Sequence, residues 1–246
     1  MGFLCFRQIR TPFEMIHVCT FGNEPQYTRS VTELCEEART SGYFDTVTPY
    51  TQSVLPDEHR AFVQRNRRGY GYWLWKPIVL LETMRRANEG DVVIYADAGC
   101  VIHTHDDARK HFAEWIEAVK THPTHRISFQ MTHQEETWTK ADVFRAMDCD
   151  SEEYTHTGQH SASIQIYQVN SDNRAFLQEL LRYMCMENYR LSTDAPSKLP
   201  NSKSFQEHRH DQSIRSLLCK KYGSHVYPDH WNNPSFPIVT MRRKYA

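Results

Sequence analysis

Residues 67–100 decide the fold of this chain: R-R-G-Y-G-Y-W-L-W-K-P-I-V-L-L-E-T-M-R-R-A-N-E-G-D-V-V-I-Y-A-D-A-G-C. Gly90 and Asp91 form a turn, and the unbroken apolar run Val92–Ala96 predicts a short strand buried on both faces. The run ends at Asp97, next to Ala98 and Gly99. Open α/β sheets bind ligands at the carboxyl ends of their strands, so Asp97 is a candidate site residue.

The segment before this strand predicts a helix over residues 77–87. Pro77 suits the first helical position, and Ile78, Leu81 and Met84 fall on one face together with Arg85. The aromatic residues 70–75 then form a loop just before the helix. We interpret the whole unit as the floor of a site for a nucleotide-linked substrate.

Composition bounds the remaining possibilities. The chain has 246 residues, long enough for one sizeable α/β core. Its 29 Lys and Arg nearly balance 30 Asp and Glu, which argues against a nucleic-acid scaffold or a polybasic membrane surface. Seven scattered cysteines, without a C-x-x-C pair, indicate neither a disulfide framework nor a zinc ribbon. No apolar run is long enough for a membrane span. Residues 1–15 show no signal peptide, and Met1-Gly2 does not begin a complete myristoylation motif. These features predict a cytoplasmic protein.

Periodicity predicts a β-α-β opening, with strands at 15–20 and 44–48 around a helix at 27–40. The glycine fingerprint G-x-G-x-x-G is missing. Further strands are expected at 127–131 and 163–169. Further helices are expected at 57–66, 109–121, 140–147, 174–189 and Asp211–Tyr222. With no repeat and no shift in composition, we predict one α/β domain, 1–246, whose central sheet is mixed and mainly parallel.

Three motifs occur in an order that resembles GT-A-fold glycosyltransferases, in particular the glycogenin-like branch. A strand leads into Asp97-Ala98-Gly99, residues 161–170 read S-A-S-I-Q-I-Y-Q-V-N, and His210-Asp211-Gln212-Ser213 follows. The segments 71–77 and 95–99 also resemble small glycosyltransferases of bacteria and of large DNA viruses such as chloroviruses. The resemblance covers the chain from Ile16 to about Trp231.

This resemblance implies a hexosyl- or pentosyltransferase with a GT-A, Rossmann-like fold. It would move a sugar from a nucleotide donor, UDP-linked such as UDP-xylose or a UDP-hexose, to a glycan hydroxyl. The nucleotide-binding half would span about 14–105 and the acceptor-side half about 106–246. The partners implied are the donor and a glycan acceptor, in the host cytoplasm if the protein is virus-encoded.

The resemblance also implies a Mn²⁺ or Mg²⁺ ion, held by D-x-D carboxylates and a late histidine. Asp97 matches the first Asp, but Gly99 stands in place of the second. His230 is placed like the late histidine, with His225 as the alternative. If no metal binds, Lys76, Arg67 and Arg68 are the nearest cations that could neutralise the donor diphosphate.

Other site residues follow from the same resemblance. Asp211 would contact the donor sugar or act as the base towards the acceptor hydroxyl, beside Gln212. The nucleotide would lie against residues that end the first strand, and tryptophans could stack on sugar faces. The full set of expected donor contacts is Thr20, Phe21, Gly22, Arg67, Trp75, Lys76, Asp97 and Gln212, with Trp73 as a further stacking candidate.

Structural roles compete with these assignments. Asp97 could begin an ordinary turn, Asp211 could be only a helix N-cap, and the tryptophans could belong to the core. The His103-x-His105 and His208-x-His210 pairs lack the helical spacing of a zinc hydrolase site. The alternatives to a transferase are therefore a non-catalytic nucleotide-sugar or carbohydrate-binding module and a metal-dependent hydrolase.

Overall fold

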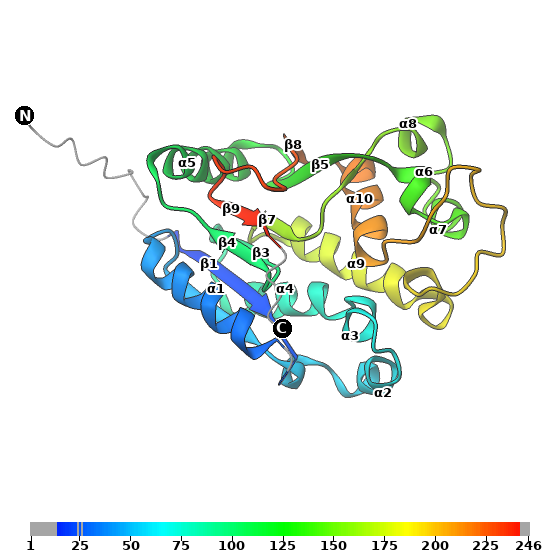
Figure 1. Ribbon diagram of the computed structural model, residues 1–246, viewed down its shortest axis with the longest axis horizontal. Coiled ribbons are helices and arrows are strands. Elements are labelled where there is room, and N and C mark those ends of the chain that lie inside the picture. The colour runs from blue at the N-terminus through cyan, green and yellow to red at the C-terminus, as the bar shows by residue number, and fades with distance from the viewer. Residues whose placement is uncertain (1–13, 24, 26, 242–246) are drawn as a thin grey trace, which may run out of the picture.

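The computed structural model describes residues 14–23, 25 and 27–241 (Figure 1). The expectations about residues 1–13, which concern a signal peptide and an acylation motif, lie outside these ranges. Among the described residues, no helix is both long and apolar enough to cross a bilayer.

A seven-stranded sheet forms the centre, in the order β2-β1-β3-β7-β5-β6, with β8 paired to β5. β1, β2, β3, β5 and β8 run one way, whereas β6 and β7 run the other way. The mixed, mainly parallel sheet predicted from the sequence is therefore confirmed. The strands are β1 (Ile16–Phe21), β2 (Thr46–Tyr50), β3 (Val92–Ala96), β5 (Arg126–Gln134), β6 (Gly158–His160), β7 (Ile164–Gln168) and β8 (His225–Pro228).

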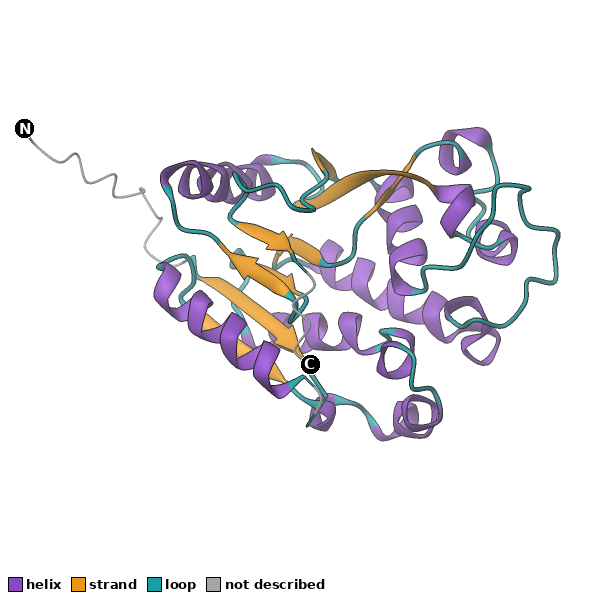
Figure 2. Cartoon of the chain, in the orientation of Figure 1, coloured by secondary structure: helices purple, strands orange, loops and turns teal. Residues whose placement is uncertain are grey.

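Helices cover both faces of this sheet (Figure 2). The longer ones are α1 (Thr28–Ser41), α2 (Asp57–Arg65), α4 (Trp75–Arg86), α5 (Asp106–Thr121), α9 (Ser171–Tyr189) and α10 (Asp211–Tyr222). The shorter ones are α3 (Gly69–Tyr72), α6 (Glu135–Trp138), α7 (Ala141–Ala146), α8 (Glu152–Thr155), η1 (Gln52–Val54) and η2 (Arg190–Ser192). A separate two-stranded ribbon pairs β4 (Cys100–Ile102) with β9 (Ile238–Thr240), drawn red beside green in Figure 1.

The side chains of β3 point alternately to the two faces of the sheet, which explains why each face carries its own hydrophobic core. Val93 and Tyr95 face a core shared with α4, α9 and α10, whereas Val92, Ile94 and Ala96 face a second core shared with α1, α5 and the β4-β9 ribbon. Because all five side chains are fully buried, the strand is apolar throughout, as residues 92–96 predict. Its carboxyl end is the first place where β3 can present a charged side chain.

Most elements match the sequence-based expectations to within two or three residues. The largest difference for the deciding stretch is that α4 begins at Trp75 and not at Pro77, so Pro77 is its third residue. Proline is still tolerated there because the first four N–H groups of a helix have no partner within it. The short strands β4, β6, β8 and β9 were not expected, since three or four residues are too few to show a period.

Candidate functional site

A cavity of about 1230 Å³ opens at the carboxyl edge of the sheet. Register pairs Cys19 of β1 with Tyr95 of β3, so Phe21 and Asp97 emerge at the same edge. Further walls come from parts of α1 and α2, the 67–76 stretch, residues 131–138, the start of α10 and the loop around Trp231. The volume exceeds the roughly 300–1,000 Å³ usual for one small ligand, which leaves room for two substrates.

Lys76 lies at the centre of the charged groups in this cavity. Its Nζ is 3.2 Å from Oδ1 of Asp97 and 3.2 Å from Oδ2 of Asp211. It also donates to the backbone carbonyl of Ala162 at 3.2 Å. The side chain of Lys76 is only 4% exposed and that of Asp211 only 6%, whereas Asp97 is 29% exposed. Asp97 is therefore the carboxylate that a ligand in the cavity can approach most readily.

Tyr95 holds the carboxylate of Asp97 through a hydrogen bond. Its hydroxyl donates to Oδ1 of Asp97 at 2.5 Å, and burial raises the pKa of this phenol well above its usual value, so that it stays a donor. The backbone N–H of Asp97 donates to the carbonyl of Ser163 at 2.8 Å. The bond to Ser163, the residue before β7, fixes the backbone of Asp97, and the bond from Tyr95 fixes its carboxylate.

Burial and neighbouring charges shift the pKa values of Asp211 and Lys76. Burial, reinforced by the charge of Asp97, raises the pKa of Asp211 to about 6, although Lys76 lowers it. Burial alone would lower the pKa of Lys76, but Asp211 and Asp97 outweigh it and raise this pKa above its ordinary value. Lys76 is therefore an ammonium at neutral pH, and Asp211 is a carboxylate that can accept a proton near neutrality.

Asp211 owes its position to the start of α10. The N-cap is His210, whose side chain makes no capping hydrogen bond, so Asp211 is the first residue of the helix and not its cap. His210 has φ 55°, and Tyr70, Tyr72 and Trp73 opposite it also have positive φ. Such strain in non-glycine residues persists where the surroundings enforce it, and it often marks functional sites. Trp73 stacks on His210, with ring centroids 5.3 Å apart, and so joins the two strained segments.

The expected nucleotide contacts are only partly brought together. Phe21, Gly22, Arg67 and Trp75 line the cavity, but Thr20 is buried and does not. Trp75 stacks on Phe21 with centroids 4.1 Å apart, so one face of its indole is taken by the protein. A Cβ on Gly22 would lie 2.5 Å from Cγ2 of Val31, so this turn requires glycine. The structure thus gives Trp75 a packing role as well as a place in the wall.

Gln212 also lines the cavity, and its amide is fixed by neighbours. Its Oε1 accepts from the backbone N–H of Ala162 at 3.3 Å, and its Nε2 donates to Oε1 of Gln159 at 2.6 Å. Gln159 is itself fully buried. The side chain therefore presents a pre-set orientation beside Asp211.

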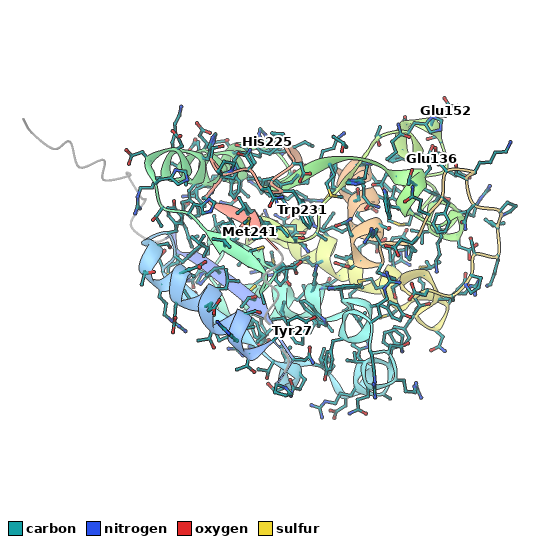
Figure 3. All side chains as sticks on the ribbon, viewed as in Figure 1. Tyr27, Glu136, Glu152, His225, Trp231 and Met241 are labelled. Carbon is teal, nitrogen blue, oxygen red and sulfur yellow. The ribbon has the colours of Figure 1, made fainter. Side chains whose placement is uncertain are left out.

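His230, a donor expected for a divalent cation, is enclosed by the protein. His230 is fully buried, with Nε2 2.9 Å from the hydroxyl of Ser161 and Nδ1 3.3 Å from that of Thr240. Burial lowers the pKa of His230 to about 4. His225 lies in β8, against Tyr227 and at the upper edge of Figure 3, and does not line the cavity. Within residues 14–23, 25 and 27–241, no three His, Cys, Asp or Glu side chains form a group that could hold a metal ion.

Several cavity residues were missed by the sequence analysis. Tyr95 could have been found, because it stands two residues before Asp97 and side chains at i and i+2 share a strand face. No comparable signal marks Trp138 at the end of α6 or Arg209 and Trp231 in loops, because these residues are far apart in the sequence. The guanidinium of Arg209 lies 4.2 Å from the ring centre of Trp138, and Trp231 is labelled near the middle of Figure 3.

Comparisons with known proteins bear on the fold. No family model and no curated protein matches the chain. A solved structure of the bifunctional glycosyltransferase WbbM aligns with 96% of this chain and 47% of its own, at 10% identity and a TM-score of 0.51. Mouse xyloside xylosyltransferase 1 aligns over 92% and 97% of the two chains, at 9% identity and 0.46. A glycosyltransferase involved in glycosylation of the major capsid of PBCV-1 aligns over 94% of each, at 11% identity and 0.45. The predicted GT-A glycosyltransferase fold is confirmed, and identities this low show the fold alone.

Proposed function

We propose that the protein is a glycosyltransferase that moves a sugar from a nucleotide-sugar donor, UDP-linked, to a hydroxyl of a glycan. The observation that carries this proposal is the position of the Asp97–Lys76–Asp211 centre in a large cavity at the carboxyl edge of a glycosyltransferase fold. A binding module would need the cavity, but it would not need a buried carboxylate whose pKa is raised to about 6.

In the proposed reaction, the bond between the sugar C1 and the diphosphate oxygen breaks, and its electron pair leaves with the nucleoside diphosphate. The acceptor oxygen forms the new bond to C1, and its proton passes to Asp211. A base with a pKa near the working pH is ionised when the acceptor arrives and still holds the proton afterwards. Asp97, the more exposed carboxylate, would accept hydrogen bonds from donor sugar hydroxyls.

The leaving diphosphate needs positive charge around it. Arg67, Arg68 and Arg209 line the cavity. Arg68 is shared between Asp194 and Glu207 at 2.9 and 3.2 Å, and Arg209 lies 3.0 Å from Glu207. Arg67 is exposed, and no ion pair of it is found within the described part of the chain. Arg67 is therefore the cation that we assign to the diphosphate.

The test is a donor screen followed by a transfer assay. UDP-glucose, UDP-galactose and UDP-xylose are compared by thermal shift, and the donor that stabilises the protein most is assayed for UDP release with and without glycan acceptors. Acceptor-stimulated release of UDP supports the transferase. Saturable donor binding without turnover would indicate a binding module, and cleavage of phosphate esters without any sugar donor would indicate a hydrolase.

A further inference from the structure

We propose that the ammonium of Lys76 is the resident cation of this site, held between Asp211 and the expected metal ligand Asp97, and that the protein binds its donor without a metal ion. This inference rests on the proposed function for the identity of the ligand. Its structural part rests only on Lys76 and its neighbours.

The first observation is that the protein surrounds the ammonium with three acceptor oxygens, through one hydrogen bond and two ion pairs. A lysine ammonium has three N–H donors and no acceptor. Lys76 faces three acceptors at 3.2 Å each, which are Oδ1 of Asp97, Oδ2 of Asp211 and the carbonyl of Ala162. The ammonium is thus held between the carboxylates by the protein itself, and no ligand is needed to place it.

The second observation is that the ammonium already pairs with both carboxylates. Oδ1 of Asp97 accepts from the Tyr95 hydroxyl and lies 3.2 Å from Nζ of Lys76. Oδ2 of Asp211 is buried, makes no hydrogen bond within the described residues and has Nζ of Lys76 3.2 Å away. Mg²⁺ binds oxygen at about 2.0–2.1 Å and demands near-octahedral geometry. An ion that bridged these same two oxygens would meet the ammonium, and like charges at such a separation repel strongly in a buried site.

The third observation concerns the missing ligands. Gly99 has no side chain to offer where a second aspartate would stand, and both ring nitrogens of His230 face hydroxyl groups of Ser161 and Thr240. The site therefore lacks these two metal ligands and contains the positive charge of Lys76 instead. A site that carries its own cation has no use for a second carboxylate in the loop or for a free imidazole.

The aromatic rings around the Lys76 side chain explain why the cation is fixed. Lys76 is the second residue of α4, and its Nζ lies 5.5 Å from the ring centre of Tyr95 and 5.8 Å from that of Trp75. These two rings form an apolar wall beside the ammonium that excludes water. The π-electrons of the rings also attract the positive charge. Withdrawal of the side chain would leave two carboxylates facing each other without compensation, which is strongly unfavourable.

The experiment measures metal binding directly. Mn²⁺ is titrated by calorimetry at neutral pH into the wild-type protein, Lys76→Ala, and Lys76→Ala combined with Asp97→Asn. We expect no saturable Mn²⁺ site in the wild type. Removal of the ammonium should leave an empty space between two carboxylates, so Lys76→Ala should gain one Mn²⁺ site, which Asp97→Asn should remove again.

Two results of this titration would overturn the proposal. One is a saturable Mn²⁺ site in the wild type that Asp97→Asn abolishes. The other is a folded Lys76→Ala protein that gains no site, since the ammonium would then not stand in a cation position.

A second measurement needs no variant at Lys76. The Kd of UDP for the wild type is compared in EDTA and in excess Mn²⁺, and we expect a ratio near one. A tenfold or greater gain with Mn²⁺ that disappears in Asp97→Asn would refute a metal-free site. If UDP binds under neither condition, the proposed donor class is wrong, whereas the Mn²⁺ titration still decides whether Lys76 replaces a metal.

Discussion

Nζ of Lys76 lies 3.2 Å from Oδ2 of Asp211, so the first turns of α4 and α10 meet at an ion pair in the wall of the cavity. The two helices pack on the same face of the sheet, and both contribute to the same core. Their packing brings a lysine from the first third of the chain against an aspartate near its end.

Asp211→Asn should lower the transfer rate by roughly a hundredfold to ten-thousandfold, because the amide cannot accept the acceptor's proton. The variant should fold, since Lys76 keeps Asp97 as a partner. The measurement is the transfer rate beside the melting temperature. Asp229→Asn is the matched control, because Asp229 also lines the cavity but accepts from the backbone N–H of Trp231 at 3.1 Å. Equal transfer rates for the two variants would show that Asp211 is not the base of the reaction.

The pH profile of kcat/KM should rise through about pH 6 and level off above it, because the pKa of Asp211 is raised to about 6 and the base works in its ionised form. Lys76 lowers this pKa, so Lys76→Met should move the rising limb to higher pH. A limb that stays in place in Lys76→Met, or moves to lower pH, would show that another group controls the profile.

Tyr95→Phe should cost about 1.5–3 kcal/mol of unfolding free energy, as expected for a hydrogen bond to a charged group, and should also lower the transfer rate. The rate should fall because Asp97 loses one of the two groups that hold Oδ1. Tyr43→Phe is the control: its hydroxyl donates to the carbonyl of His103 at 2.7 Å, in the core on the opposite face of the sheet. Denaturant unfolding and transfer assays of both variants should show stability loss in each and rate loss only in Tyr95→Phe.

Arg67→Ala should weaken UDP binding about tenfold, the effect of losing one charge-assisted contact to phosphate. Arg65→Ala is the control, because Arg65 is also exposed but lies in α2 and does not line the cavity. Calorimetry with UDP compares the two. Similar Kd values for Arg67→Ala and Arg65→Ala would place the diphosphate elsewhere in the cavity.

Trp231→Ala should raise the KM for the glycan acceptor by roughly threefold to tenfold and leave the Kd of UDP unchanged, because an indole contributes stacking to a sugar face. Trp231 lines the cavity on the side contributed by the C-terminal loops, labelled near the centre of Figure 3. A change in UDP affinity with an unchanged acceptor KM would assign Trp231 to the donor side.

The sequence by itself determined the sheet and its edge. The apolar run Val92–Ala96 predicted a strand buried on both faces, and a strand there places Asp97, directly after it, at the carboxyl edge. The helices α1 and α10 were equally well defined, since apolar residues repeat every three or four positions and Gly42 and Gly223 follow with positive φ. Local periodicity and turn chemistry are properties of neighbouring residues, so they can be found without the fold.

Only the tertiary structure decided what Asp97 meets. The sequence left Lys76 as one of three possible cations and Asp211 as either a cap or a catalytic group. Their ion pair depends on how α4 and α10 pack against β3, a relation between residues far apart in the chain. The same packing buries His230 against the hydroxyl groups of Ser161 and Thr240, a contact that spacing along the chain does not predict. Burial and long-range contact set the charge state of these groups, and neither can be deduced from spacing along the chain.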